Sequence, residues 1–102
     1  MAISFSLKDK VAIVTGSSRG IGEAIARAFA DNGAKVVLSS RKQESLDAVA
    51  SSIKASGGEA LPVACHTGKM EMIDSLFDQV MKTYGRVDIL VNNAAANPYF
   101  GS

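Results

Sequence analysis

Several residue types that mark whole classes of protein are scarce in this sequence. Cys65 is the only cysteine among its 102 residues, so no disulfide can form within the chain. No apolar run approaches the ~20 residues of a membrane span, and the N-terminal segment MAISFSLKDK lacks the apolar core of a signal peptide. The formal net charge is only +1 with the basic residues scattered, which argues against nucleic-acid binding. These absences predict a cytoplasmic protein with neither a membrane nor a nucleic-acid partner.

Four short apolar runs predict four β-strands. They cover residues 10–16, 34–40, 59–67 and 87–94, and the first two are rich in the β-branched residues of strands buried on both faces. Pro62 in the third run cannot donate a ladder hydrogen bond. We therefore expect this strand at a sheet edge, or Pro62 near its start.

Between these runs, apolar residues recur with helical spacing. Three helices are predicted, and the glycines that follow them, Gly33, Gly57 and Gly85, suit helix C-termini. The predicted buried face of the first helix is Ile21, Ile25, Ala28 and Phe29. That of the second is Leu46, Val49, Ala50 and Ile53, and that of the third is Ile73, Leu76, Phe77, Val80, Met81 and Tyr84.

The alternation of strand and helix predicts an α/β fold, a three-layer Rossmann-like parallel sheet with strand order 3-2-1-4. The first two helices should cover one face of the sheet and the third helix the other. In such sheets a ligand binds at the carboxyl ends of the strands where the strand order reverses, here the first and the fourth.

The segment VAIVTGSSRGIG, residues 11–22, places Gly16, Gly20 and Gly22 between a strand and a helix. A helix N-terminus binds phosphate through free N–H groups, and residues without a Cβ permit close approach. Ser17 and Ser18 are expected to add hydroxyl donors. Turns and caps also use glycine, so the triplet alone fits a structural role equally well. Its place between a buried strand and an amphipathic helix favours phosphate binding.

Two motifs bring a family resemblance. TGSSRGIG resembles the TGxxxGxG motif of the short-chain dehydrogenases/reductases, and VDILVNNAA resembles that family's NNAG motif. The resemblance covers essentially the whole chain. It implies that residues 1–102 form a dinucleotide-binding Rossmann half-domain, truncated after the fourth strand, with the catalytic segment absent. SSRK, CHTGK and NNAAANPYFGS resemble the NADP-dependent retinol dehydrogenase/carbonyl reductase branch.

The resemblance implies a nicotinamide dinucleotide as cofactor. It places the pyrophosphate near Gly16, Ser18, Gly20, Ile21 and Gly22, and the adenosine ribose beside Asn92, Ala94 and Ala95. Ala95 stands where the motif usually has glycine. His66 stands where the family has a pair of residues that contacts the adenine, and a partly buried structural imidazole fits that position equally well.

The end of the second strand indicates which nicotinamide cofactor fits. An acidic residue there would bind a ribose 2′-hydroxyl and repel a 2′-phosphate. This sequence has Ser40 and Arg41 instead, and no carboxylate before Glu44. Arg41 can form a charge-assisted pair with phosphate, Ser40 can donate to it, and Arg19 can approach from the other side. Each arginine alone fits a solvated surface charge, but together they favour NADP(H) over NAD(H).

No catalytic residue of the family can be named in this sequence. The family transfers its proton with a Tyr-x-x-x-Lys pair downstream of NNAG. Tyr84 is followed four positions later by Asp88, and Tyr99 lies too near the last residue, Ser102, to head such a pair. We also expect no metal site, because Cys65 and His66 are adjacent in a strand and point to opposite faces. Cys65 itself is expected to be a small core residue.

The leading hypothesis is therefore the NADP(H)-binding portion of a short-chain oxidoreductase that interconverts carbonyls and alcohols. It is not expected to be catalytically competent as this chain alone, and a small carbonyl or alcohol substrate is expected only for a full-length form. The alternative is a non-catalytic nucleotide-binding or interaction module that associates with other chains. The apolar fourth strand would be an exposed edge where the family has further strands and helices, so either the sequence is the front part of a longer enzyme or it self-associates through that edge.

Overall fold

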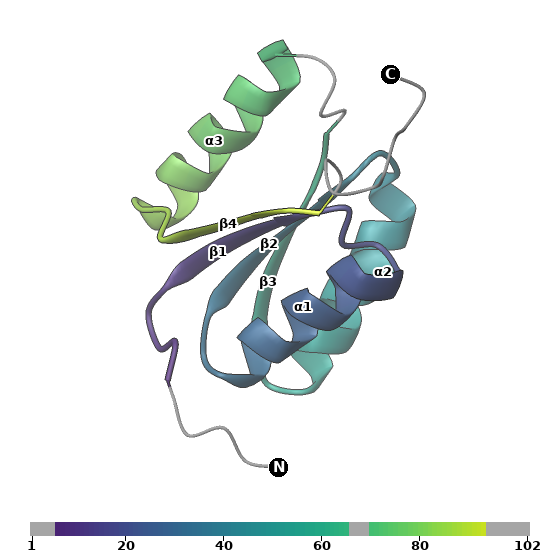
Figure 1. The fold of residues 1–102 in the computed structure, drawn as a ribbon, viewed down its shortest axis with the longest axis vertical. Coiled ribbons are helices and arrows are strands. Elements are labelled where there is room, and N and C mark those ends of the chain that lie inside the picture. The colour runs from purple at the N-terminus through teal and green to yellow at the C-terminus, as the bar shows by residue number, and fades with distance from the viewer. Residues whose placement is uncertain (1–5, 66–69, 94–102) are drawn as a thin grey trace.

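The computed structural model describes residues 6–65 and 70–93 of the chain. Strands and helices alternate along it in the order β1 (Val11–Thr15), α1 (Gly20–Asp31), β2 (Lys35–Ser40), α2 (Gln43–Ala55), β3 (Glu59–Ala64), α3 (Met70–Tyr84) and β4 (Ile89–Asn92). All the strand pairs are parallel, and the sheet order is β3-β2-β1-β4. Figure 1 shows α1 and α2 on one side of this sheet and α3 on the other. The predicted three-layer Rossmann-like fold is confirmed.

Alternate residues of the central strands supply the two apolar cores. Ala12, Val14, Val36 and Leu38 pack with buried residues of α1 and α2. Val11, Ile13 and Val37 point the other way, where they pack with Leu76 and Val80 of α3. Because β1 and β2 are covered on both faces, every residue of β1 is buried. This burial fixes the position of the strand ends, from which the loops emerge.

The faces predicted for α1 and α3 are partly wrong. Ile21 is 72% exposed and Ala28 is also exposed, whereas Gly22, Ala26 and Ala30 are the buried residues of α1. Because these three residues are small and four apart, the helix axis lies close to the sheet and larger side chains flank the contact. In α3, the side chain of Met81 is 49% exposed rather than buried.

The prediction that β3 is an edge strand is confirmed, although Pro62 lies in the middle of the strand and not near its start. The N–H of Cys65 donates to the Ser40 carbonyl of β2 at 2.8 Å. The Pro62 carbonyl and the Ala64 N–H face away from β2, toward the outer edge. The side-chain amide of Gln43 binds both groups: it donates to the Pro62 carbonyl at 3.2 Å and accepts the Ala64 N–H at 3.0 Å. The nitrogen of Pro62 faces the same outer edge, where no ladder bond is required.

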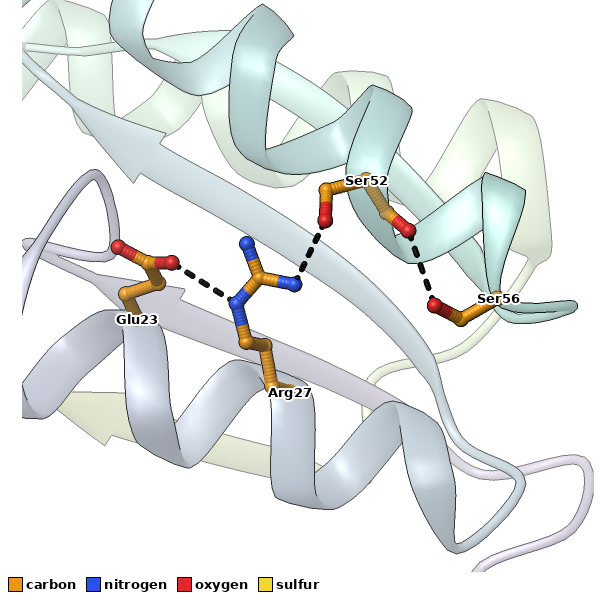
Figure 2. A network of polar contacts seen from close by, with 4 residues as sticks. All are labelled: Glu23, Arg27, Ser52 and Ser56. Atoms are coloured by element: carbon orange, nitrogen blue, oxygen red, sulfur yellow. Dashed lines mark hydrogen bonds and ion pairs between the residues drawn. The ribbon is translucent and has the colours of Figure 1, made fainter.

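A polar network joins the two helices on the α1–α2 side of the sheet (Figure 2). Arg27 of α1 donates from Nε to Glu23 at 2.8 Å and from Nη1 to the Ser52 hydroxyl of α2 at 2.9 Å. The Ser56 hydroxyl donates to the Ser52 carbonyl at 3.2 Å and so extends the network to the end of α2. These bonds tie together helices that share the core beneath them.

Candidate functional site

Three segments that are far apart in the sequence meet at the carboxyl edge of the sheet. Thr15, the last residue of β1, is in register with Ser39 of β2 and with Asn92 of β4. The glycine-rich turn, residues 16–19, leaves β1 at this point and leads directly into α1. Strand register therefore sets the turn, the end of β2 and the end of β4 side by side.

The turn depends on backbone conformations that favour glycine. Gly16 has a φ of 63° and Gly20 a φ of 62°, in the left-handed region that other residues enter at a cost. Arg19 occupies the N-cap of α1 in an extended conformation, and no side-chain hydrogen bond caps the helix. The first N–H groups of α1 have no partner within the helix, and no described side chain caps them, an arrangement that can bind an anion.

Gly22 brings α1 against the turn. A Cβ at this position would overlap the Gly16 carbonyl and would lie 2.8 Å from Nδ2 of Asn93. The same Asn93 Nδ2 donates a hydrogen bond to the Gly16 carbonyl at 3.2 Å. Asn93 therefore holds the turn from the β4 side. The sequence prediction did not include this residue, although its place beside Asn92 in the NNAG-like segment was a signal for it.

Asn92 lies where its motif predicted, at the end of β4. The Thr15 hydroxyl donates to Oδ1 of Asn92 at 3.1 Å and also approaches the Val91 carbonyl at 3.3 Å. Thr15 is buried while the Asn92 residue is largely exposed. The side chain of Asn92 thus joins β4 to β1 at the floor of the site.

Ser17 is fully buried and bonded to β2. Its N–H donates to the Ser39 carbonyl at 3.1 Å, and its Oγ accepts the Ser39 N–H at 2.9 Å. The hydroxyl is therefore engaged by the protein, and the expectation of a free hydroxyl donor at Ser17 is wrong. Ser18, which is half-buried, is the remaining serine of the turn.

Arg19 and Arg41 give the site an unpaired positive charge. Both are exposed, and neither forms an ion pair with any other residue that the structure describes. Ser40 accepts the Lys42 N–H at 3.4 Å, which leaves its hydroxyl proton available to donate. No carboxylate lies between Ser40 and Glu44 to oppose an anion.

Cys65 is buried, as expected of a core residue. Burial raises the pKa of its thiol, and a weak hydrogen bond with the Ser39 hydroxyl opposes that shift only in part. The thiol is therefore protonated at neutral pH and is a poor nucleophile. His66, Ala94 and Ala95, three predicted site residues, lie outside the described residues.

Within 6–65 and 70–93, no cluster of three or more His, Cys, Asp or Glu side chains could hold a metal ion. Over the same residues, no helix has the length and apolar character needed to cross a membrane.

A parallel sheet in this order, with a glycine-rich turn and an uncapped helix N-terminus at its carboxyl edge, defines the Rossmann class of dinucleotide-binding proteins. Residues 10–100 match the family model described as short chain dehydrogenase. The chain therefore belongs to the short-chain dehydrogenase family, and the predicted family is confirmed. Membership in this oxidoreductase family supports a nicotinamide dinucleotide as the ligand of the site.

Curated relatives agree with this assignment. Dehydrogenase/reductase SDR family member 4 of Homo sapiens is 48% identical over 96 residues, which are 94% of this chain and 34% of the relative. Tropinone reductase-like 3 of Erythroxylum coca is 49% identical over 89 residues, 87% of this chain and 34% of the relative. The chain thus spans about a third of the length of the curated relatives that it matches.

Solved structures share the fold. A metagenomic short-chain oxidoreductase in complex with NADP is 46% identical with a TM-score of 0.81, and the match covers 84% of this chain and 39% of that one. A hydroxysteroid dehydrogenase from Escherichia coli is 38% identical with a TM-score of 0.84, over 85% of this chain and 37% of that one.

Proposed function

We propose that the chain forms the NADP(H)-binding part of a short-chain oxidoreductase that interconverts carbonyls and alcohols. One observation carries the proposal: the uncapped N-terminus of α1 meets a turn that Gly16, Gly20 and Gly22 keep free of side chains. Main-chain N–H groups of this turn and helix would hold the diphosphate of the cofactor. The cofactor, when bound, supplies the hydride that passes to a carbonyl carbon.

The preference for NADP(H) rests on charge. Arg41 and Arg19 stand on the two segments that flank the expected position of the 2′-phosphate, and neither is neutralised by another described residue. Ser40 has a hydroxyl proton to donate. A guanidinium pairs with a phosphate far better than with a ribose hydroxyl, so these residues favour the phosphorylated cofactor. The NADP complex of the related metagenomic enzyme supports the same choice.

Proton transfer is proposed to lie outside residues 1–102, which would act as a cofactor-binding half-domain. A catalytic tyrosine needs a pKa lowered toward neutral pH. Burial first, and then the charge and hydrogen bond of Glu59, raise the pKa of Tyr84 to about 12. Tyr84, the last residue of α3, is thus suited to packing against the core and not to acid–base chemistry. The substrate, a small carbonyl or alcohol, would be bound by a longer form of the protein.

The proposal has two further parts, self-association and cellular location, which rest on the exposed β4 edge of the sheet and on the free thiol. β4 is an edge of the sheet formed by the described residues, and Leu90 on it is 52% exposed, so we propose self-association through this edge. The protein is proposed to be cytoplasmic, where the free thiol of Cys65 would stay reduced.

Substitution of Arg41 tests the cofactor preference. In Arg41→Asp, the carboxylate would repel a 2′-phosphate and accept a hydrogen bond from a 2′-hydroxyl, so NADH should bind more tightly than NADPH. Titration calorimetry of the intact protein with both nucleotides measures the two dissociation constants. Lys54→Asp makes the same change in charge at the far end of α2 and should keep the wild-type preference.

Two results would contradict the proposal at different levels. An Arg41→Asp protein with an unchanged ratio of the two dissociation constants would remove the preference for NADP(H). A folded wild-type protein that binds neither nucleotide at millimolar concentration would remove nicotinamide-nucleotide binding altogether.

A further inference from the structure

The glycine-rich turn and the end of β2 are joined by one reciprocal contact. Ser17 donates its N–H to the Ser39 carbonyl at 3.1 Å, and the Ser39 N–H donates to the Ser17 Oγ at 2.9 Å. Both residues are fully buried. The contact adds one rung beyond the last register pair of β1 and β2, Thr15 with Ser39. The acceptor of the second bond is the Ser17 side-chain oxygen, because the main chain of the turn has already left the sheet at this point.

The position of this contact in the sequence relates it to the two arginines. Ser17 precedes Arg19 by two residues, and Ser39 precedes Arg41 by two residues. The Ser17–Ser39 contact therefore lies between the two guanidinium-bearing segments and, together with the register of β1 and β2, sets the spacing between them. The diphosphate part of the site has other supports, because Asn93 binds the Gly16 carbonyl and Gly22 seats α1 against the turn.

The Ser39 hydroxyl takes no part in the contact. It is buried without a nitrogen or oxygen partner among the described residues, and its neighbour is the weakly bonding Cys65 thiol. Only the main chain of Ser39 meets Ser17. Among the described residues, the Ser17 hydroxyl is thus a side-chain group that links the two segments: it accepts the Ser39 N–H and donates to the Ser39 carbonyl at 3.5 Å.

We infer that Ser17 is a positioning residue for cofactor selectivity: its hydroxyl fixes the distance between the arginine-bearing turn and the arginine-bearing end of β2. The inference rests on the proposed NADP(H)-binding function. A ligand with a 2′-phosphate contacts both segments at once, so it needs them at a fixed distance. A ligand without that phosphate relies on the turn and α1, which the Asn93 and Gly22 contacts hold separately.

Ser17→Ala removes the Oγ that accepts the Ser39 N–H, and the loss of this buried hydrogen bond should loosen the end of β2 against the turn. We expect the dissociation constant for NADPH to rise about tenfold and that for NADH to change by less than about twofold. Ser17→Cys keeps a similar size with a weak sulfur acceptor and should change the ratio in the same direction. It serves as the second variant if Ser17→Ala does not fold.

Ser39→Ala is the matched control, since it removes a buried serine hydroxyl that bonds neither Ser17 nor any other nitrogen or oxygen among the described residues. The NADPH to NADH ratio should stay at the wild-type value in this variant. The measurement is calorimetric titration of the intact protein, together with amide hydrogen exchange at Ser39. Exchange at that amide should accelerate in the Ser17 variants before any nucleotide is added.

The outcomes separate this inference from the function beneath it. If wild type prefers NADPH and the Ser17 variants lose affinity equally for both nucleotides, or keep the ratio unchanged, Ser17 has only a structural role and the inference is wrong. If wild type binds neither nucleotide, or prefers NADH, the proposed function fails and the inference falls with it.

Discussion

At the scale of single residues, the site is built by what glycine omits. Gly22 has no side chain in a place where the Gly16 carbonyl and the Asn93 amide already meet. The N–H groups at the start of α1 can then lie beside the turn without an intervening methyl group. Ile21, the residue before Gly22, is displaced outward and exposes its side chain at the same edge.

Gly22→Ala should destabilise the protein and weaken nucleotide binding. The new methyl group overlaps a main-chain carbonyl, so α1 must move away from the turn, at a cost of about 1–3 kcal/mol in the free energy of unfolding. Urea denaturation and NADPH titration measure the two effects. Gly57→Ala is the control, because its φ of 92° brings backbone strain while no atom lies within 4 Å of the added Cβ. Equal nucleotide affinity in both variants would contradict this role of Gly22.

Some residues of the site could be predicted from the sequence and others could not. The three glycines and the two arginines follow from their order between strand and helix. The pairings of Ser17 with Ser39 and of Gly16 with Asn93 depend on which strands become neighbours and in which register. A serine in a turn is equally suited to bind a ligand or the protein, and only the register of β1 and β2 decides between them.

At the scale of elements, helix faces were predicted less well than helix positions. The apolar periodicity of α1 selects its large residues, yet the buried stripe is made of Gly22, Ala26 and Ala30. A helix that packs closely on a sheet needs small side chains on its contact face. A prediction from hydrophobicity alone gives such small residues little weight. The second helix buries the four residues that its period predicts.

Asp88, which directly precedes β4, stabilises the N-terminal end of β1. Its carboxylate accepts the Val11 N–H at 2.8 Å and is held by Arg86 at 2.7 Å. The Arg86 hydrogen bond, and then that of Val11, lower the pKa of Asp88 below its ordinary value. A lowered pKa in the folded state contributes stability above the unfolded pKa, and this stability is lost as the pH falls through the folded value.

Asp88→Asn should therefore lower the melting temperature at neutral pH and weaken the acid-side dependence of stability. Thermal unfolding followed by circular dichroism from pH 7 down to acid measures both. Asp78→Asn is the control for the loss of one negative charge, since it alters an exposed carboxylate with no bond to another described residue. Parallel profiles for wild type and Asp88→Asn would show that Asp88 does not support β1 electrostatically.

The network in Figure 2 predicts a small coupling between α1 and α2. Arg27→Ala, Ser52→Ala and the double variant form a cycle, and the expected coupling free energy is below about 1 kcal/mol because the pair is exposed. Chemical denaturation of the four proteins measures it. Ser51→Ala, at an exposed neighbour without such a bond, should show no coupling to Arg27. A coupling of several kcal/mol would mean that the network, and not the core, holds the helices together.

At the scale of the whole molecule, strand order and layering could be predicted because few topologies satisfy alternating strands and helices. The extent of individual strands could not. The third and fourth apolar runs are longer than β3 and β4, since sequence pattern shows where apolar residues lie but not where a neighbouring strand ends.

The exposed apolar edge predicts an effect on assembly. Leu90→Lys should reduce self-association, because a charged side chain on an edge strand opposes pairing with another chain. Sedimentation velocity over a range of concentrations measures the change. Met81→Lys is the control, since Met81 is also an exposed apolar residue, at 49%, but belongs to α3 and not to the edge strand. An identical concentration dependence in Leu90→Lys and wild type would exclude the β4 edge as the interface.

The crowding of Gly16, Gly22 and Asn93 also constrains how this chain can change over generations. A side chain at position 22 demands a displaced carbonyl at 16 and a withdrawn amide at 93, although these positions are distant in the gene. Mutations there are non-additive, so each first step is unfavourable unless another has preceded it. We accordingly expect the three residues to be retained or replaced together.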